Sequence, residues 1–419
     1  MYAPAQIGGQ GFKHIKKGVG EKAAPALFSA RAMRKGTALT LALDVAPYAL
    51  VALVVFTAAL GSPVLAQLCA VVIVVYAGNA AFGECDLASA ALGDAPRSAY
   101  DGKVVWITGA SQGLGETLAV HLGSMGAKLI LSSRREETLR RVCDAARAAG
   151  ARDARALTLD ARAGSAAMRE KGAAALALAK EMASGASEDE TDAMMNTDDA
   201  GVDYIFHVAG GSQHAAAEDT ADEVDRDMFE LNTMSAIALT KALLPSMLQR
   251  RSGTIVAVGS MAVKCPAPGQ ATYAATKAAL SAFCHSLRGE VADRGVNVTV
   301  AHPGPIATGL GGQTRVIFGA TLAKSTCDTG DSAGDSAEGS SRGAKVGKKE
   351  RRLNALWVAR KIAAGAALGL DEVVLATQPI MLLRNFMQFV PSVGYRVLNK
   401  VGPKRTRAAR AGVSMYELK

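Results

Sequence analysis

The stretch VVWITGASQGLG, residues 104–115, joins an apolar run to three glycines at the spacing T-G-x-x-x-G-x-G and leads into a helical pattern at residues 116–123. Glycines let a backbone approach a pyrophosphate closely, and the N-terminus of the following helix offers free N–H groups and the positive end of the helix dipole. A glycine-rich turn without a ligand is the alternative, but strand, loop and helix occur in the order that a dinucleotide site requires. The stretch predicts an α/β fold of the Rossmann type, with a doubly wound parallel sheet of about seven strands.

A second stretch, residues 254–277, carries three side chains suited to proton transfer. Tyr273 and Lys277 are four residues apart, so on a helix they share one face. An ammonium group there favours the phenolate of a tyrosine whose pKa is otherwise about 10. Ser260 follows an apolar run, residues 254–258, and so lies at the carboxyl end of a predicted strand, where open α/β sheets place their ligands. By itself the Y-x-x-x-K spacing more often reflects a core tyrosine and a solvated lysine than a catalytic site, and the upstream glycine loop reverses that preference.

With Asn232, inside a helical pattern over residues 229–249, these motifs occur in the order in which the short-chain dehydrogenase/reductase family carries them. The chain resembles that family over about residues 101–310. The resemblance implies hydride transfer between a nicotinamide and a carbonyl carbon. It implies that Ser260 polarises the carbonyl oxygen and Tyr273 donates the proton, while Lys277 lowers the tyrosine pKa and holds the nicotinamide ribose. Asn232 would hold a water that links Lys277 to solvent.

The residues after the second predicted strand, 127–132, indicate which cofactor is bound. They read Ser133-Arg134-Arg135, where a carboxylate would bind a ribose 2′-hydroxyl and repel a phosphate. Arginine instead pairs with a 2′-phosphate, so we predict NADP(H) over NAD(H), with Arg134 as the first candidate. An exposed arginine at a helix start is the alternative.

The resemblance implies further contacts to the cofactor. Asp160, after a predicted third strand at residues 156–159, would bind the adenine amino group, and Thr308 would orient the nicotinamide. The predicted cofactor-binding residues are Gly109, Ser111, Gln112, Gly113, Leu114, Gly115, Arg134, Arg135, Asp160, Ala209, Gly210, Tyr273, Lys277, Pro303, Gly304, Ile306 and Thr308. One departure stands before Ala209, at the end of the predicted strand 203–208. The family normally reads two asparagines there, and this chain has His207 and Val208, which puts one cofactor-side hydrogen bond in doubt.

The N-terminal part predicts a membrane anchor, because residues 45–83 contain no charged residue. They form either one span or a hairpin of two, broken at residues 61–63. Basic residues before the stretch and acidic residues after it favour a cytosolic N-terminus, so one span would place the catalytic part in a lumen and a hairpin would return it to the cytosol. We expect the endoplasmic reticulum membrane. An organellar, plastid membrane is the alternative, because residues 1–40 are basic and acid-poor like a transit peptide.

The predicted organisation follows from these segments. It comprises a basic segment at 1–40, the anchor at 41–83, a catalytic Rossmann domain at 101–320, a disordered Ser/Gly/Asp-rich insertion at 324–350, and residues 351–419, which complete the domain and end in a basic membrane-proximal tail. The net charge of +9 lies in the two ends, and the remainder is slightly acidic, which argues against a nucleic-acid groove. No Cys or His spacing indicates a metal, nor does the acidic loop at residues 188–199.

The last seventy residues narrow the resemblance to the dehydrogenase/reductase family member 7 group, through residues 372–379, 387–391 and 399–405. Residues 381–398 mix apolar, aromatic and basic side chains, which favours a segment against the membrane and the substrate mouth, with a plain core helix as the alternative. We therefore predict an NADPH-dependent carbonyl reductase for a lipophilic substrate such as a retinoid or a steroid. A 3-ketosphinganine-type reductase, a hydroxysteroid dehydrogenase and a non-catalytic nucleotide-binding scaffold are the alternatives. Members of the family commonly pair through the helices bearing Asn232 and Lys277, so a homodimer is expected.

Overall fold

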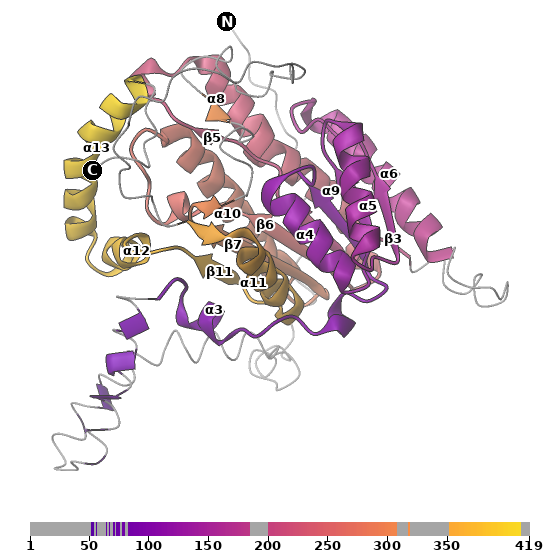
Figure 1. Ribbon diagram of the computed structural model, residues 1–419, viewed down its shortest axis with the longest axis horizontal. Coiled ribbons are helices and arrows are strands. Elements are labelled where there is room, and N and C mark those ends of the chain that lie inside the picture. The colour runs from indigo at the N-terminus through magenta and orange to yellow at the C-terminus, as the bar shows by residue number, and fades with distance from the viewer. Residues whose placement is uncertain are drawn as a thin grey trace, which may run out of the picture.

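A computed structural model describes residues 83–184, 200–307, 317–318 and 352–411, with scattered helical residues between 52 and 79. At its centre lies a seven-stranded sheet in the order β11-β7-β6-β4-β1-β2-β3, and every neighbouring pair is parallel. Figure 1 shows this sheet with its helices. The strands are β1 Val104–Thr108, β2 Lys128–Ser132, β3 Asp153–Ala156, β4 Tyr204–His207, β6 Gly253–Val258, β7 Val296–Pro303 and β11 Glu372–Leu375.

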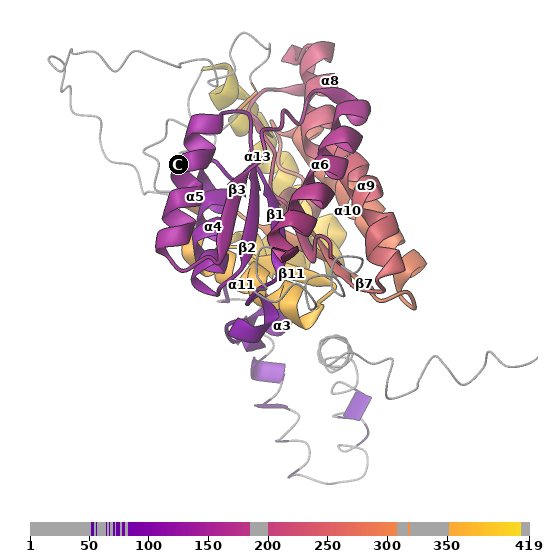
Figure 2. The same ribbon diagram turned by 90° about the vertical axis from the view of Figure 1, so that its right-hand side faces the viewer.

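Helices cover both faces of the sheet, as Figure 2 shows. One face packs against α4 Gly113–Ser124, α5 Glu136–Ala148 and α11 Ala355–Leu368, and the other against α6 Gly164–Ser184, α9 Ser235–Gln249 and α10 Ala271–Val291. Successive residues of a strand point to opposite faces, so Val105 and Ile107 join the first core cluster while Val104 and Trp106 join the second. This explains why β1 is apolar from Val104 to Ile107: a parallel strand covered on both faces has no solvent side.

The remaining elements are short or peripheral. Two pairs of two-residue strands lie outside the main sheet: β5 Ser212–Gln213 pairs with β9 Ile317–Phe318, and β8 Ile306–Ala307 pairs with β10 Leu353–Asn354. The other helices are α3 Leu87–Ala91, α8 Asp222–Phe229, α12 Ile380–Phe389 and α13 Pro391–Arg410. Single turns lie at η2 Arg97–Ala99, η3 Ala217–Asp219 and η5 Met261–Val263.

The strand order reverses between β1 and β4, because the chain runs outward from β1 to β3 and then returns to the other side of β1. Such a switch point leaves a crevice at the carboxyl ends of the two strands, where open α/β sheets bind their ligands. The glycine loop follows β1, and the segment from Ala209 to Gly211 follows β4. The doubly wound parallel sheet of the predicted fold class is confirmed. The strand order places the glycine loop and the segment after β4, both predicted to bind the cofactor, at the same edge of the sheet.

Two local expectations differ from the structure, and three others cannot be compared with it. The third strand runs over Asp153–Ala156 rather than residues 156–159, although Leu157 and Leu159 still donate backbone hydrogen bonds to the end of β2. The single helix expected over residues 229–249 is interrupted by a π-helical segment, η4 Glu230–Met234. The predicted acidic loop at 188–199, the insertion at 324–350 and Thr308 lie outside the described residues.

The membrane anchor predicted at residues 41–83 also falls mostly outside them. In the part of the chain that the structure describes, no helix has both the length and the apolar character needed to cross a bilayer. The anchor therefore stays a prediction.

Candidate active site

The four predicted catalytic residues come from three segments around the carboxyl ends of β4 and β6. Asn232 lies in η4, Ser260 follows β6 by one residue, and Tyr273 and Lys277 lie in the first two turns of α10. Asn232, Ser260 and Lys277 are buried, while Tyr273 is half-buried. The structure thus places all four at the edge of the sheet that the strand order selects.

Lys277 is tied to the strand that carries Ser260. Its Nζ donates a hydrogen bond to the carbonyl oxygen of Val258, the last residue of β6, at 2.9 Å. The side chain is only 4% exposed, and burial lowers the pKa of Lys277 from 10.5 to about 8. An ammonium with this pKa still carries its proton at neutral pH. It therefore places a positive charge one helical turn from Tyr273.

Asn232 connects this lysine to the segment after β4. Its Oδ1 accepts a hydrogen bond from the Gly211 N–H at 2.8 Å, and its Nδ2 donates to the Gly211 carbonyl at 3.0 Å and to Thr276 Oγ1 at 3.0 Å. A Cβ on Gly210 would lie 2.9 Å from Asn232 Oδ1 and 3.1 Å from Lys277 Nζ. The ends of the two side chains therefore converge on Gly210. Because π-helical segments often occur at functional sites, the irregular helix at Asn232 agrees with its predicted role.

Ser260 and Tyr273 are each oriented by local hydrogen bonds. Ser260 is the N-cap of η5, and its Oγ accepts a hydrogen bond from the Ala262 N–H at 3.1 Å. The backbone N–H groups of Thr272 and Tyr273 donate to Gln213 Oε1 at 3.1 and 3.4 Å, which fixes the first turn of α10. Gln213 is fully buried and comes from β5. No local sequence pattern indicates this role, because Gln213 and Tyr273 are sixty residues apart in the chain.

The glycine loop approaches the segment after β4 at backbone distance. Gly109 has φ +70°, and a Cβ there would lie 2.7 Å from the Cα of Ala209. Gly113 begins α4, and Gln112, in its N-cap position, makes no side-chain capping hydrogen bond. Ser111 and Gln112 are half-buried, whereas Leu114 and Gly115 are buried. These positions form the backbone cradle at a helix N-terminus that suits a pyrophosphate.

The segment after β2 offers the polar groups expected for a 2′-phosphate. Arg134 and Arg135 are exposed, and neither pairs with a carboxylate within the described part of the chain. The Oγ of Ser133 is buried and has no hydrogen-bond partner among the described residues. The Leu159 N–H donates to the Ser133 carbonyl at 2.9 Å, which brings the next residue, Asp160, to the same end of the sheet. Ser133 was not predicted as a site residue, because a serine before two arginines carries no distinctive signal.

His207, which replaces an asparagine of the family pattern, points away from this edge. Its Nε2 lies 2.9 Å from Thr240 Oγ1 on α9, and the side chain is buried. Burial, with a smaller contribution from the charge of Lys277, lowers the pKa of His207 to about 3, so the ring is neutral at physiological pH. The hydroxyl of Thr108 accepts hydrogen bonds from the Val208 and Ala209 N–H groups at 3.2 and 3.3 Å. His207 and Val208 therefore pack against the core, and the Thr108 hydroxyl fixes the end of β4 by its hydrogen bonds.

The predicted nicotinamide side of the site follows β7. Pro303 ends that strand, and the Gly304 N–H donates to the Leu375 carbonyl at 2.6 Å. Ile306 lies in β8, and a Cβ on Gly304 would lie 3.0 Å from that of Ala376. The turn after β7 is thus held against the end of β11.

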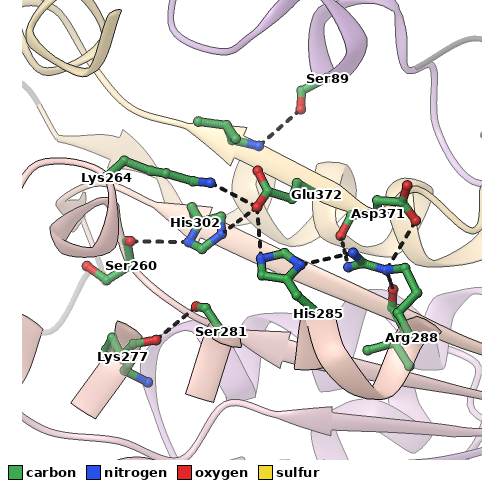
Figure 3. A network of polar contacts seen from close by, with 12 residues as sticks. Ser89, Ser260, Lys264, Lys277, Ser281, His285, Arg288, His302, Asp371 and Glu372 are labelled. Carbon is green, nitrogen blue, oxygen red and sulfur yellow. Dashed lines mark hydrogen bonds and ion pairs between the residues drawn. The ribbon is translucent and has the colours of Figure 1, made fainter. Parts of the chain in front are cut away.

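A polar cluster lies behind Ser260, and sequence spacing gave no sign of it (Figure 3). His302 from β7 places Nδ1 3.3 Å from the Ser260 carbonyl oxygen and Nε2 3.4 Å from Glu372 Oε1 of β11. His285 Nε2 from α10 and Lys264 Nζ lie 3.0 and 2.9 Å from the same Glu372 oxygen. Four elements distant in sequence thus meet at one carboxylate.

The donors around Glu372 determine its charge. Burial by itself would raise the pKa of Glu372, but the contacts from His285, His302 and Lys264 outweigh it and hold that pKa well below its ordinary range. Arg288 Nη1 lies 2.9 Å from His285 Nδ1, and because a guanidinium only donates, His285 carries its proton on Nε2 toward Glu372. His285, His302 and Glu372 lie close enough together to hold a metal ion. Such an ion would have to displace the Lys264 ammonium and the proton on His285 Nε2. We interpret the cluster as an ion-pair network.

Replacing Glu372 with glutamine is expected to lower the free energy of unfolding at pH 7 by about 2 kcal/mol, since charged hydrogen bonds contribute on this order. The folded-state pKa of Glu372 is lowered, so its contribution is fully present above the unfolded carboxyl pKa of about 4.3 and is lost as pH falls through the folded value. Urea unfolding at pH 7 and at about pH 4 measures both effects. Between these pH values the wild type should lose more stability than the variant. Glu290→Gln, at an exposed position on α10, is the matched control and should behave as wild type.

The comparisons with known proteins agree with this geometry. The short chain dehydrogenase family model matches residues 103–316. The human protein named dehydrogenase/reductase SDR family member 7 is 29% identical over 311 residues, covering 74% of this chain and 80% of the human one. The Drosophila melanogaster family protein 7-like is 37% identical over 214 residues, 51% of this chain and 60% of the fly protein. The rat protein named family member 7B is 34% identical over 253 residues, covering 59% of this chain and 71% of the rat protein.

Two solved structures are also similar to this chain. An alcohol dehydrogenase from Thermococcus sibiricus, complexed with 5-hydroxy-NADP, is 20% identical, covers 66% of this chain and 97% of its own, and has a TM-score of 0.49. A metagenomic short-chain oxidoreductase in complex with NADP is 26% identical and has a TM-score of 0.43. The match covers 50% of this chain and 86% of the oxidoreductase.

The family assignment rests on the sequence match together with the glycine loop, the strand order and the four residues at the sheet edge. The chain belongs to the short-chain dehydrogenase/reductase family, oxidoreductases that act on CH–OH and C=O groups with a nicotinamide cofactor, and within it resembles the proteins named dehydrogenase/reductase family member 7.

Proposed function

We propose that the protein is an NADPH-dependent carbonyl reductase acting on a lipophilic ketone or aldehyde such as a retinoid or a steroid. One observation carries the proposal: Asn232 and Lys277 converge on Gly210, with Tyr273 one turn before Lys277 and Ser260 at the end of the neighbouring strand. This arrangement unites a proton donor, a cation that lowers its pKa and a hydroxyl for the substrate oxygen.

Each residue has a part in the reaction that its contacts support. The Ser260 hydroxyl hydrogen can be directed to a carbonyl oxygen while its Oγ accepts from Ala262 N. Tyr273 gives its phenolic proton to that oxygen, and the buried charge of Lys277 stabilises the phenolate left behind. Asn232 holds the segment after β4 in register with α10. The water relay from Lys277 to solvent stays a prediction.

The residues at the switch point fit a nicotinamide dinucleotide, which would supply the hydride. A Cβ at Gly109 would meet the backbone of Ala209, so a glycine there keeps the loop close to the segment after β4. Gly109, Gly113 and the first turn of α4 would hold the pyrophosphate. Support for NADPH over NADH comes from the segment after β2. Among the described residues, the buried Ser133 Oγ has no hydrogen-bond partner and neither Arg134 nor Arg135 forms an ion pair.

Arg134→Ser is expected to raise the KM for NADPH by about 10- to 100-fold and to leave the KM for NADH nearly unchanged. The physical reason is that a charge-assisted bond to phosphate contributes about 1.5–3 kcal/mol, and NADH lacks that phosphate. Initial rates with both cofactors measure the effect. Arg169→Ser, an exposed arginine on α6, should change neither constant. Equal losses with both cofactors would contradict a phosphate contact.

Substrate class is tested with NADPH over a panel of retinal, steroid ketones and simple aromatic diones. The lipophilic assignment draws its support from the uncharged stretch at residues 45–83 and from the resemblance to the member 7 group. Product analysis of lipid extracts separates it from a 3-ketosphinganine-type reductase or a hydroxysteroid dehydrogenase. Tight NADPH binding without turnover on any of these carbonyls would instead support a non-catalytic nucleotide-binding scaffold.

Location and assembly remain proposals as well. The preference for the endoplasmic reticulum membrane over an organellar membrane rests on sequence. Phe229, the last residue of α8, and Met234, the last residue of η4, expose apolar side chains, which supports the predicted homodimer.

A further inference from the structure

The C-terminal helices α12 and α13 lie on one flank of the molecule (Figure 1), and their sequence is strongly basic. No aspartate or glutamate occurs from residue 373 to residue 411. Arg396 and Lys400 are exposed, and within the described part of the chain neither makes an ion pair. The basic side chains of this flank are Arg384, Arg396, Lys400, Lys404, Arg405, Arg407 and Arg410. Arg410 pairs with Glu218 and Asp219, whereas Arg396 and Lys400 leave their positive charge facing solvent. Positive charge of this kind attracts an anionic surface.

Apolar side chains lie in a row next to these charges. Val393, Val397 and Val401 repeat every four residues on α13 and are 37%, 40% and 39% exposed. Phe389 and Val390, at the junction of the two helices, are exposed as well. A helix with exposed apolar residues beside basic ones is suited to the interface of a membrane, where the apolar row enters the headgroup layer. An acidic protein partner would pair with the basic side chains but would give no reason for the exposed valine row beside them.

The chain itself brings residue 83, the end of the uncharged N-terminal stretch, to the same flank. The Gly83 carbonyl accepts a hydrogen bond from Gln378 Nε2 at 3.0 Å, and the Glu84 carbonyl accepts one from the Ala376 N–H at 2.8 Å. These contacts fix residue 83, the end of the stretch without charges, just before α12 begins at Ile380. Among the described residues of that stretch, helical ones such as Phe56 and Val74 expose apolar side chains.

Helix α13 is also attached to the loop that carries the catalytic residues. Arg405 Nε donates a hydrogen bond to the Pro268 carbonyl at 3.0 Å, and a Cβ on Gly402 would lie 3.4 Å from Pro268 Cγ. Pro268 lies between Ser260 and Tyr273. A membrane surface in contact with α13 would therefore be separated only by that helix from the loop that leads to Tyr273, the proton donor.

We propose that α12 and α13 are a docking surface for an anionic lipid leaflet, which sets the loop from Ser260 to Tyr273 beside the membrane. The occupant follows from charge complementarity, from the adjoining valine row and from the place where the uncharged stretch leaves the domain. The inference goes beyond the reductase activity and does not depend on it. It explains how a lipid-soluble carbonyl would reach the site without crossing water.

The test places a reporter on the valine row of the full chain. Val397→Trp is mixed with vesicles that contain brominated lipid, made of phosphatidylcholine alone or of phosphatidylcholine with phosphatidylserine, and the wild-type signal of the two native tryptophans is subtracted. We expect strong quenching on anionic vesicles, weak quenching on neutral ones, and loss of the difference at high salt. Ala173→Trp, on the exposed face of α6, should show no quenching on either.

Charge reversal gives the matched comparison. Adding Arg396→Glu and Lys400→Glu to the reporter should lower the ratio of docked to undocked α13 by about 30-fold or more, since each basic side chain near an anionic surface contributes roughly a fivefold preference. Arg169→Glu with Lys180→Glu, two exposed residues of α6, makes the same change in net charge and should leave quenching intact.

NADPH turnover in detergent, expected to be equal in the two double variants, shows that both are folded and keeps this result separate from the proposed chemistry. If the tryptophan introduced at position 397 stays unquenched on anionic vesicles, or is quenched equally on neutral ones, the anionic docking surface is wrong.

Discussion

Turnover of a carbonyl substrate by Tyr273→Phe is expected to fall by about 10²- to 10⁴-fold, the usual contribution of a positioned general acid. The substitution removes only the phenolic hydroxyl. The ring of Tyr273 packs against Val224 and Met228, and those contacts survive in phenylalanine. The loss should therefore appear in kcat, while the NADPH dissociation constant and the thermal midpoint stay near the wild-type values.

The measurement is NADPH oxidation by the detergent-purified chain, beside a binding titration of NADPH by protein fluorescence. Tyr204→Phe is the matched control, because Tyr204 begins β4, at the opposite end of the strand from the site, and its ring stacks near Phe206. That variant should keep full turnover. Activity within a few-fold of wild type in Tyr273→Phe would show that the proton comes from another group and would overturn the proposed mechanism.

The second large effect is expected at the glycine loop. A Cβ on Gly115 would lie 2.2 Å from the Gly109 carbonyl oxygen and 3.0 Å from the Ala110 Cα, and both are backbone atoms of the loop itself. Gly115→Ala must therefore move α4 away from the loop. Forced overpacking of this kind costs about 1–3 kcal/mol and sometimes more, and we expect about 3 kcal/mol here.

NADPH affinity should fall together with stability in Gly115→Ala, because the loop and the first turn of α4 are the predicted pyrophosphate cradle. Urea unfolding and an NADPH titration measure the two effects. Gly289→Ala provides the control, since Gly289 is exposed on α10 with no atom within 4 Å of an added Cβ. It should stabilise the protein by about 0.5–1 kcal/mol through helix propensity and leave NADPH affinity unchanged. Unchanged affinity in Gly115→Ala would place the cofactor elsewhere.

Local patterns were enough to predict much of this site. The glycine loop, the strand before it and the helix after it are contiguous in sequence, so their order already specifies the crevice. Tyr273 and Lys277 share a helix, and the helical repeat puts them on one side without further information. Asn232 was found through the family pattern, yet its hydrogen bonds to Gly211 and Thr276 were not foreseen.

The boundaries of the elements and the long-range contacts between them were harder to predict from the sequence. The third strand was placed three residues late, because its sequence, Asp153–Ala156, lacks the apolar run of the central strands. An edge strand is paired on one side only, so its residues need not be apolar. The seventh strand, Glu372–Leu375, was noticed only as a resemblance, although its four residues complete the sheet beside β7.

By itself the sequence determined the fold class, the order of the motifs and the residue types available for proton transfer, because all of these depend on neighbours along the chain. Only the tertiary structure decided that His302, His285 and Lys264 meet at Glu372 behind Ser260, that Thr108 rather than His207 holds the end of β4, and that residue 83 leaves the domain beside α12. Each of these contacts joins elements from distant parts of the chain. Their formation depends on strand order and helix packing, which no local pattern of residues encodes.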